Sequence, residues 1–331
     1  LLSFNGLTAN RSVLTWIAYA VTAIGIAVLV IRVVCFKKYL HAKGLFLLIA
    51  FCGSYALSAL LTRQYGLSEN AKALVWMAFQ YFILYTYDTT SDGTAEKKEF
   101  YIISHFFMAY TFLAVVAGTV MLFADYYSYT EVNGVVVILG FLWNRLWGVY
   151  SDPNYGAVFS AITIIMSLYF YKDAKKPLKV LYIINIVLQI CYIAFSDSRT
   201  GMVSLFCALL VYVYLTALRS KKLEAKKAFA RGVICVLLAV TAAVASFAAI
   251  KVVSVSTSEF KKWQYEHIIS SDKDKTDAQK EKDKQKLEIG RQSNDINGDV
   301  SNRRFAIWGS GLEIFKTKPL TGVTFRNYVP Y

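Results

Sequence analysis

The sequence predicts an all-α, polytopic membrane protein, and three observations lead to this fold class. Hydrophobic residues make up 56% of the 331 residues, and the mean hydropathy is +0.43, which is high for a soluble domain. The apolar residues form about eight separate runs near the length that a helix needs to cross a bilayer. Strands of alternating polarity, as in a membrane barrel, are not recognisable. Because lipid offers the backbone no hydrogen bonds, each run is expected to be a helix.

The predicted spans follow one another with short connections. They cover residues 13–35, 44–61, 71–87, 100–124, 154–171, 179–196, 201–218 and 232–253. Together they define a transmembrane bundle over residues 1–253. Residues 254–318 are predicted to form one long polar extracytoplasmic loop, since "SDKDKTDAQKEKDKQKLE" has almost no apolar residue. Residues 319–331 are expected to begin a further segment.

An amphipathic helix is expected within this loop, near residues 303–316. Phe305, Trp308, Leu312 and Phe315 recur there at three- and four-residue steps. Such an apolar face is suited to lie on the bilayer or against the bundle. The chain starts with leucine and stops soon after this helix, so we expect it to be truncated at both ends.

Basic residues set the orientation of the predicted spans. The formal net charge is +14, and lysine and arginine gather in the loops 36–43, 88–99, 172–178 and 219–231 with their flanks. The short segments on the other side hold only Arg11, Arg63, Lys72, Arg145 and Arg199. The positive-inside rule therefore places the first group of loops in the cytoplasm. This charge indicates topology and a lipid-facing surface, so no nucleic acid is expected as a partner.

The cysteines give no sign of a metal site or a disulfide framework. All five lie in or beside predicted spans, and none forms a CxxC pair. They are Cys35, Cys52, Cys191, Cys207 and Cys235. We interpret them as small apolar residues.

Four polar motifs fall together on the predicted outer side. They are "NRLWGVYSDPN", "SDSRTG", "NRRFAIW" and "KPLTG". The candidate site residues that they contain are Arg145, Gly148, Asn154, Ser198, Arg199, Arg303, Arg304 and Trp308. Motifs scattered at random over two faces would rarely all reach the same one, which argues against plain polar turns.

The local pattern in two of these motifs favours an anion site. Asp152 can cap a helix that has Pro153 at its first position, and Ser198 can cap the span that begins with Arg199. An arginine at the positive end of a helix is understandable if both attract one anion. A diphosphate fits, because arginine offers a planar fork of donors.

Each arginine also has a simpler interpretation. Arg145 could flank a re-entrant segment, Arg199 could anchor the span and pair with Asp197, and Arg304 could bind lipid headgroups. Their common placement on one face favours a shared anion site over three separate explanations.

At this point the motifs resemble the O-antigen ligase and oligosaccharide repeat-unit polymerase superfamily, over about residues 140–331. The pattern consists of an arginine, a glycine and a Pro-Asn helix start, then Ser-x-Ser-Arg-x-Gly, then Arg-x-x-x-Trp followed by Pro-x-x-Gly. The resemblance implies a GT-C-like glycosyltransferase of the cytoplasmic membrane with an extracytoplasmic active face. Its donor would be an undecaprenyl-diphosphate-linked oligosaccharide, and its product a capsule or other surface polysaccharide.

The resemblance also implies residue roles. Arg145, Arg199 and Arg304 match the family's motif arginines and would stabilise the departing diphosphate. The same motifs supply the expected substrate-binding residues Gly148, Asn154, Ser198, Arg303 and Trp308. No metal or other cofactor is expected, and the general base would be a histidine that lies beyond residue 331. One departure is Thr324, which stands where many members carry glycine.

Three functions stay open at this stage. A polymerase that joins the donor to a second glycan is the first, and a ligase that transfers the glycan to a lipid or protein acceptor is the second. A transporter or flippase for lipid-linked glycans is the third, disfavoured because the polar groups gather at one face and not at the bilayer midplane. Another type of GT-C enzyme is weaker still, since the first outside loop offers only Glu69. Expected partners are the bilayer, the glycan acceptor and other membrane proteins of polysaccharide assembly.

Overall fold

The computed structural model describes residues 11–35, 44–85, 94–132, 135–220, 228–269, 289 and 304–328. It confirms a polytopic helical membrane protein. Each of the eight predicted apolar runs is helical over most of its described residues, and six of the described helices are long and apolar enough to cross a membrane. These are Thr15–Val34, Lys97–Phe123, Pro153–Tyr171, Lys176–Ser196, Arg199–Leu218 and Phe229–His267.

Two of the eight predicted spans are helices that are too short to be counted among these six. Helix α3 (Leu45–Leu61) has 17 residues, and α4 (Leu67–Phe79) has 13 before it continues as the six-residue π-helical turn η3 (Gln80–Tyr85). The described residues divide into two compact units, one within Lys98–Ser293 and one within Ser12–Lys97 and Asn294–Tyr331.

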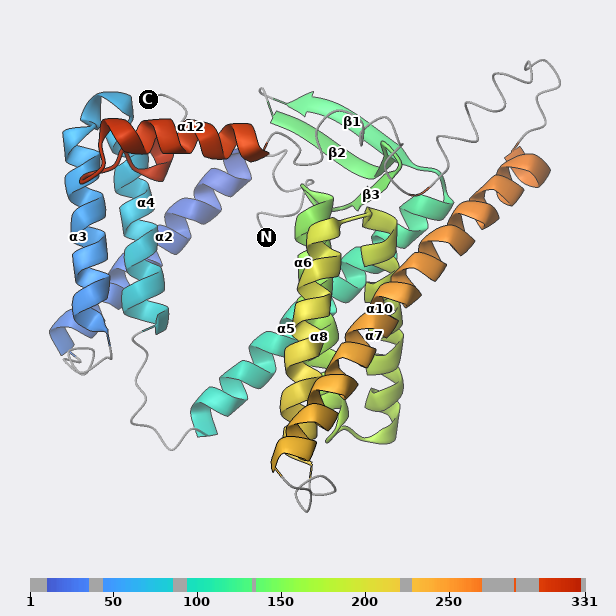
Figure 1. Ribbon diagram of the computed structural model, residues 1–331. Helices are drawn as coiled ribbons and strands as arrows, with labels where there is room; N and C mark the ends of the chain where they lie inside the picture. Colours follow the sequence, from blue (N-terminus) through green and yellow to red (C-terminus); the bar gives the residue numbers. More distant parts are fainter. Residues whose placement is uncertain are drawn as a thin grey trace. The chain divides into compact units, whose positions relative to one another are not determined.

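The first unit is built on five helices. They are α5 (Thr94–Phe123), α6 (Pro153–Tyr171), α7 (Lys176–Ser196), α8 (Arg199–Leu218) and α10 (Ala228–Gln264), the last ending in the turn η4 (Tyr265–Ile269). Helices α6, α7 and α8 pack side by side, and α10 lies against α7 and α8 (Figure 1). Helix α10 continues past residue 253, where the predicted bundle ends.

Buried polar side chains join the helices of this unit. Asn185 of α7 donates to Ser167 Oγ of α6 at 3.1 Å, and Thr111 of α5 meets Thr163 of α6 at 2.9 Å between the hydroxyls. Hydrogen bonds of this kind hold apolar helices together where lipid gives them no hydrophobic reason to associate.

A small antiparallel sheet was missed by the all-α prediction. Strands β1 (Tyr127–Val132), β2 (Val135–Leu142) and β3 (Arg145–Gly148) pair in that order. Leu142 pairs with Arg145, and the two residues between them, Trp143 and Asn144, have φ of 53° and 58°. Positive φ at both central residues is typical of the tight hairpin turns that match strand twist. The sheet lies over the end of the unit where α6 and α8 begin (Figure 1).

The extension of α10 is fixed to this sheet and to the end of α5. Lys261 is only 3% exposed; its ammonium lies 3.0 Å from Asp125 Oδ1 and 4.2 Å from the ring centre of Phe141 in β2. A buried lysine needs such a partner, because an unpaired charge away from water is costly.

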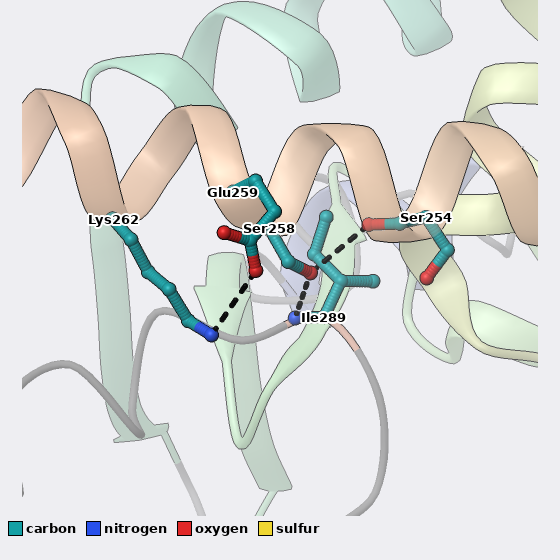
Figure 2. Close-up of polar contacts among 5 residues, drawn as sticks. All are labelled: Ser254, Ser258, Glu259, Lys262 and Ile289. Atoms are coloured by element: carbon teal, nitrogen blue, oxygen red, sulfur yellow. Dashed lines mark hydrogen bonds and ion pairs between the residues drawn. The ribbon is translucent and has the colours of Figure 1, made fainter.

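The polar segment after α10 returns to that helix at one described residue. Figure 2 shows the backbone N–H of Ile289 donating to Ser258 Oγ at 3.0 Å, while Ser258 donates to the Ser254 carbonyl at 2.9 Å. Glu259 and Lys262 pair at 3.3 Å beside this contact. Ile289 is buried in the core of the unit, so this point of the long segment is packed.

The second unit contains the N-terminal helices and the end of the chain. It consists of helix α2 (Arg11–Cys35), the α3–α4 pair and helix α12 (Arg304–Thr317). It also contains two 3-10 turns, η2 (Arg63–Tyr65) and η6 (Phe325–Asn327). Helix α12 lies at the end of this unit where η2 turns the chain from α3 into α4 (Figure 1). Its apolar residues Phe305, Trp308, Leu312 and Phe315 are all exposed.

Candidate functional site

The N-terminal turns of α6 and α8 meet at one end of the first unit. Asp152 Oδ1 accepts from the backbone N–H of Asn154 at 2.6 Å, and Ser198 Oγ accepts from that of Gly201 at 3.0 Å, so both helices are capped as the sequence indicates. A Cβ on Gly201 would lie 2.4 Å from Ala157 Cβ, so only glycine allows the two first turns this close.

Arg145 joins three elements at this junction. From the start of β3, its Nε donates to the Ser196 carbonyl at the end of α7 at 2.8 Å, and its Nη2 donates to Asn154 Oδ1 in α6 at 3.1 Å. Ser198 Oγ donates to the same Asn154 oxygen at 2.8 Å. The structure thus brings together three of the predicted site residues, Arg145, Asn154 and Ser198.

Arg199 follows directly on this cluster. It is the first residue of α8, its side chain is exposed, and the cap at Ser198 fixes the start of its helix. The exposed guanidinium therefore lies in the first turn of α8, whose beginning is bonded to Asn154.

Gly148 has a packing role behind the cluster. It is buried at φ +60°, and a Cβ there would lie 3.2 Å from the Gly118 Cα and 3.6 Å from the Tyr192 ring. The glycine lets the end of β3 approach α5 closely. Its part in substrate binding stays a prediction.

The electrostatics of the junction favour an anion. The N-termini of α6 and α8 carry partial positive charge. Arg145 and Arg199 add two full positive charges, while the carboxylates of Asp152 and Asp197 at the helix ends contribute negative charge. The ring of Tyr150, between β3 and α6, is fully buried, and this burial raises the pKa of Tyr150 well above its usual value. The phenol therefore stays neutral and does not offset the positive field.

The remaining predicted residues belong to the second unit. Arg304 begins α12, Trp308 is 65% exposed on that helix, and Arg303 lies outside the described residues. A common site of all three arginines stays a prediction.

Two residues have supporting roles that the sequence analysis did not assign to them. Tyr192, fully buried in α7, donates to the Trp147 carbonyl at 3.1 Å and so fixes β3 beside Arg145. Asp197 ends α7 with φ 43° and turns the chain into the Ser198 cap. "SDSRTG" signals the turn at Asp197, but nothing in the apolar run around Tyr192 distinguishes that tyrosine from its neighbours. Among the residues that the structure describes, no group of three His, Cys, Asp or Glu side chains could hold a metal ion.

Comparison with known proteins gives a family match over part of the chain. Residues 184–331 match the family model described as O-antigen ligase. The predicted resemblance is confirmed. The matched range includes Ser198, Arg199 and all of α12, and it indicates an enzyme of the ligase or polymerase type in polysaccharide assembly, held in a membrane by several helices. No curated protein and no solved structure matches the chain.

The matched range does not contain the whole junction. Arg145 and Asn154 precede residue 184, yet they bond to Ser196 and Ser198, which lie within it. The matched range and the preceding strand and helix therefore build the junction jointly.

Proposed function

We propose that the protein is a membrane glycosyltransferase that polymerises undecaprenyl-diphosphate-linked repeat units on the outer face of the cytoplasmic membrane. The observation that supports this most directly is the junction of two capped helix N-termini with Arg145 and Arg199. Such an arrangement matches an anion with several oxygens, such as a diphosphate.

In the proposed reaction, a hydroxyl of the acceptor glycan attacks the anomeric carbon of the donor. The new glycosidic bond forms while the bond from that carbon to the diphosphate oxygen breaks, and the electron pair stays on the diphosphate. Negative charge thus grows on the leaving group, where arginines stabilise the transition state more than the ground state. The hydroxyl proton passes to the general base, for which the resemblance implies a histidine.

The arginines divide this work according to their contacts. Arg145, held by Ser196 and Asn154, would keep the junction in shape and add fixed charge. Arg199, with its exposed side chain, would contact the diphosphate. For Arg304 the role stays the one that the resemblance implies, stabilising the departing diphosphate. Neither metal nor nucleotide takes part in this proposal.

A ligase is the second candidate, because it breaks the same bond and needs the same arginines. Only the acceptor differs, and the family description "O-antigen ligase" favours keeping this candidate. A transporter of lipid-linked glycans would be the remaining explanation if no transfer activity were found.

The test is complementation of a strain that lacks the gene, with wild type, Arg199→Ala or Arg219→Ala. Arg219 is also exposed and lies at the opposite end of α8, so it controls for loss of a charge on that helix. Loss of long glycans with single repeats retained, in the Arg199→Ala strain alone, supports a polymerase. Polymer that stays on its lipid carrier indicates a ligase, and an unchanged glycan contradicts both.

A further inference from the structure

A closed network of buried polar side chains fixes the chain after α12 to the α3–α4 corner of the second unit. Asn70 Nδ2 donates to Asn327 Oδ1 at 2.8 Å, and Asn327 Nδ2 donates to the Thr62 hydroxyl at 2.8 Å and to the Thr62 carbonyl at 3.2 Å. The three residues are at most 1% exposed. The two asparagines are 257 positions apart in the sequence.

The network is satisfied at almost every position. Asn70 Oδ1 accepts from the Tyr55 hydroxyl and from the Thr324 hydroxyl, each at 2.7 Å, and Asn70 Nδ2 also reaches the Gly66 carbonyl at 2.9 Å. Removing one member of such a network leaves buried donors or acceptors without partners, which costs more than a surface hydrogen bond. A buried network with this many hydrogen bonds therefore specifies one position for the segment that it holds.

Thr324 shows that the segment is held in one particular shape. Its backbone has φ 64° and ψ 155°, a region that residues with a Cβ rarely adopt. The hydrogen bond from its hydroxyl to Asn70 holds the threonine in that conformation. A glycine would adopt the same backbone without strain but would lose the bond.

The network reaches α12 through the next residue in the chain. Tyr328 directly follows Asn327, and its hydroxyl donates to the Ile307 carbonyl in the first turn of α12 at 2.6 Å. That turn begins with Arg304. The tyrosine ring also covers one side of the helix, since a Cβ built on Gly311 would lie 3.7 Å from the ring.

From this chain of contacts we infer that Asn70 and Asn327 are positioning residues, which hold the first turn of α12, and with it Arg304, in place for glycan transfer. They act through Tyr328 and do not touch the substrate. The inference rests on the proposed function only in the role that it gives Arg304. It also assigns a task to α3 and α4, which lie outside the range matched by the family model.

The first test measures the position of α12 without any assay of activity. In protein whose five native cysteines are replaced by alanine, Gly311→Cys would lie beneath the Tyr328 ring, whereas Gly309→Cys, which has nothing within 4 Å, would be open. In purified protein in detergent, a water-soluble maleimide should label the Gly311→Cys variant at least several-fold more slowly than the Gly309→Cys variant. Adding Asn327→Ala or Asn70→Ala should bring the two rates together. Equal rates before that change, or a difference that survives it, would overturn the inference.

The second test separates a lost hydrogen bond from a damaged fold. Thr62→Val keeps the shape of the side chain but removes the hydroxyl that accepts from Asn327, while Thr62→Ser keeps the hydroxyl. In the complemented strain, Thr62→Val and Asn327→Ala should reduce long glycan about tenfold or more at equal protein level. The Thr62→Ser variant should keep the amount of long glycan near that of wild type.

The two tests fail in different ways. If α12 is released in the labelling experiment but glycan stays normal, while Arg304→Ala abolishes it, the positioning role is wrong. If Arg304→Ala leaves glycan normal, the role of Arg304 in the proposed function is wrong, and the labelling rates still decide whether the asparagines hold α12.

Discussion

Arg145 and Arg199 carry the same charge in different surroundings, so replacing each by lysine should affect the stability of the protein differently. The two hydrogen bonds of Arg145 join β3 to α6 and α7, and a lysine ammonium cannot reproduce that planar fork. We expect Arg145→Lys to lower the free energy of unfolding by about 1.5–3 kcal/mol, the usual loss for a hydrogen bond to a charged group. The exposed Arg199→Lys should leave the Tm in detergent unchanged. Equal Tm values for both variants would show that the fork does not hold the junction.

Ser198 has two roles within one hydroxyl, as the cap of α8 and as a donor to Asn154. Ser198→Ala should therefore cost about 1 kcal/mol for the cap alone. The Gly201 amide loses its acceptor, so its hydrogen exchange should become faster. Thr200→Ala, at the exposed neighbouring position, provides the control and should change neither quantity. Unchanged exchange at Gly201 in the Ser198 variant would contradict the cap.

At the scale of elements, the site depends on the close contact of α6 and α8. A Cβ on Gly201 would fall 2.4 Å from Ala157 Cβ, and neither atom belongs to a flexible side chain that could move away. Gly201→Ala should separate the first turns and destabilise the protein by about 1–3 kcal/mol, with loss of transfer. Gly232→Ala in α10 has nothing within 4 Å and should keep or slightly raise the Tm. The comparison fails if both alanines behave alike.

The elements also show where sequence reasoning succeeds and where it does not. The caps at Asp152 and Ser198 could be predicted, because a cap depends on neighbouring residues. The sheet had a local signal in the sequence, namely Asn133-Gly134 between the tyrosine-containing stretch 127–132 and the apolar stretch 135–142, a dipeptide that favours hairpins. No local sequence signal indicated the hydrogen bond from Arg145 to the Ser196 carbonyl, since this bond requires β3 to lie across the end of α7.

At the scale of the whole molecule, features that depend on neighbouring residues could again be predicted, and features that depend on distant residues could not. The apolar runs predicted every helix that became a span, because the length of a run is a local property. The runs 44–61 and 71–87 were predicted as spans as well, but α3 has only 17 residues and α4 only 13. The contact of Asn70 with Asn327 depends on residues 257 positions apart, so nothing in either local pattern indicates it.

The orientation of the protein in the membrane can be tested at the two ends of α7. This helix has 21 residues, about 30 Å at the rise of an α-helix, so the positions just before and after it must lie on opposite faces of the membrane. Lys175 and Thr200 are both exposed at these two ends. In a chain without other cysteines, Thr200→Cys should react with an impermeant maleimide applied to intact cells, and Lys175→Cys only after the membrane is opened. The reverse pattern would put Arg199 in the cytoplasm and rule out transfer on the outer face, and labelling of both from outside would mean that α7 does not span.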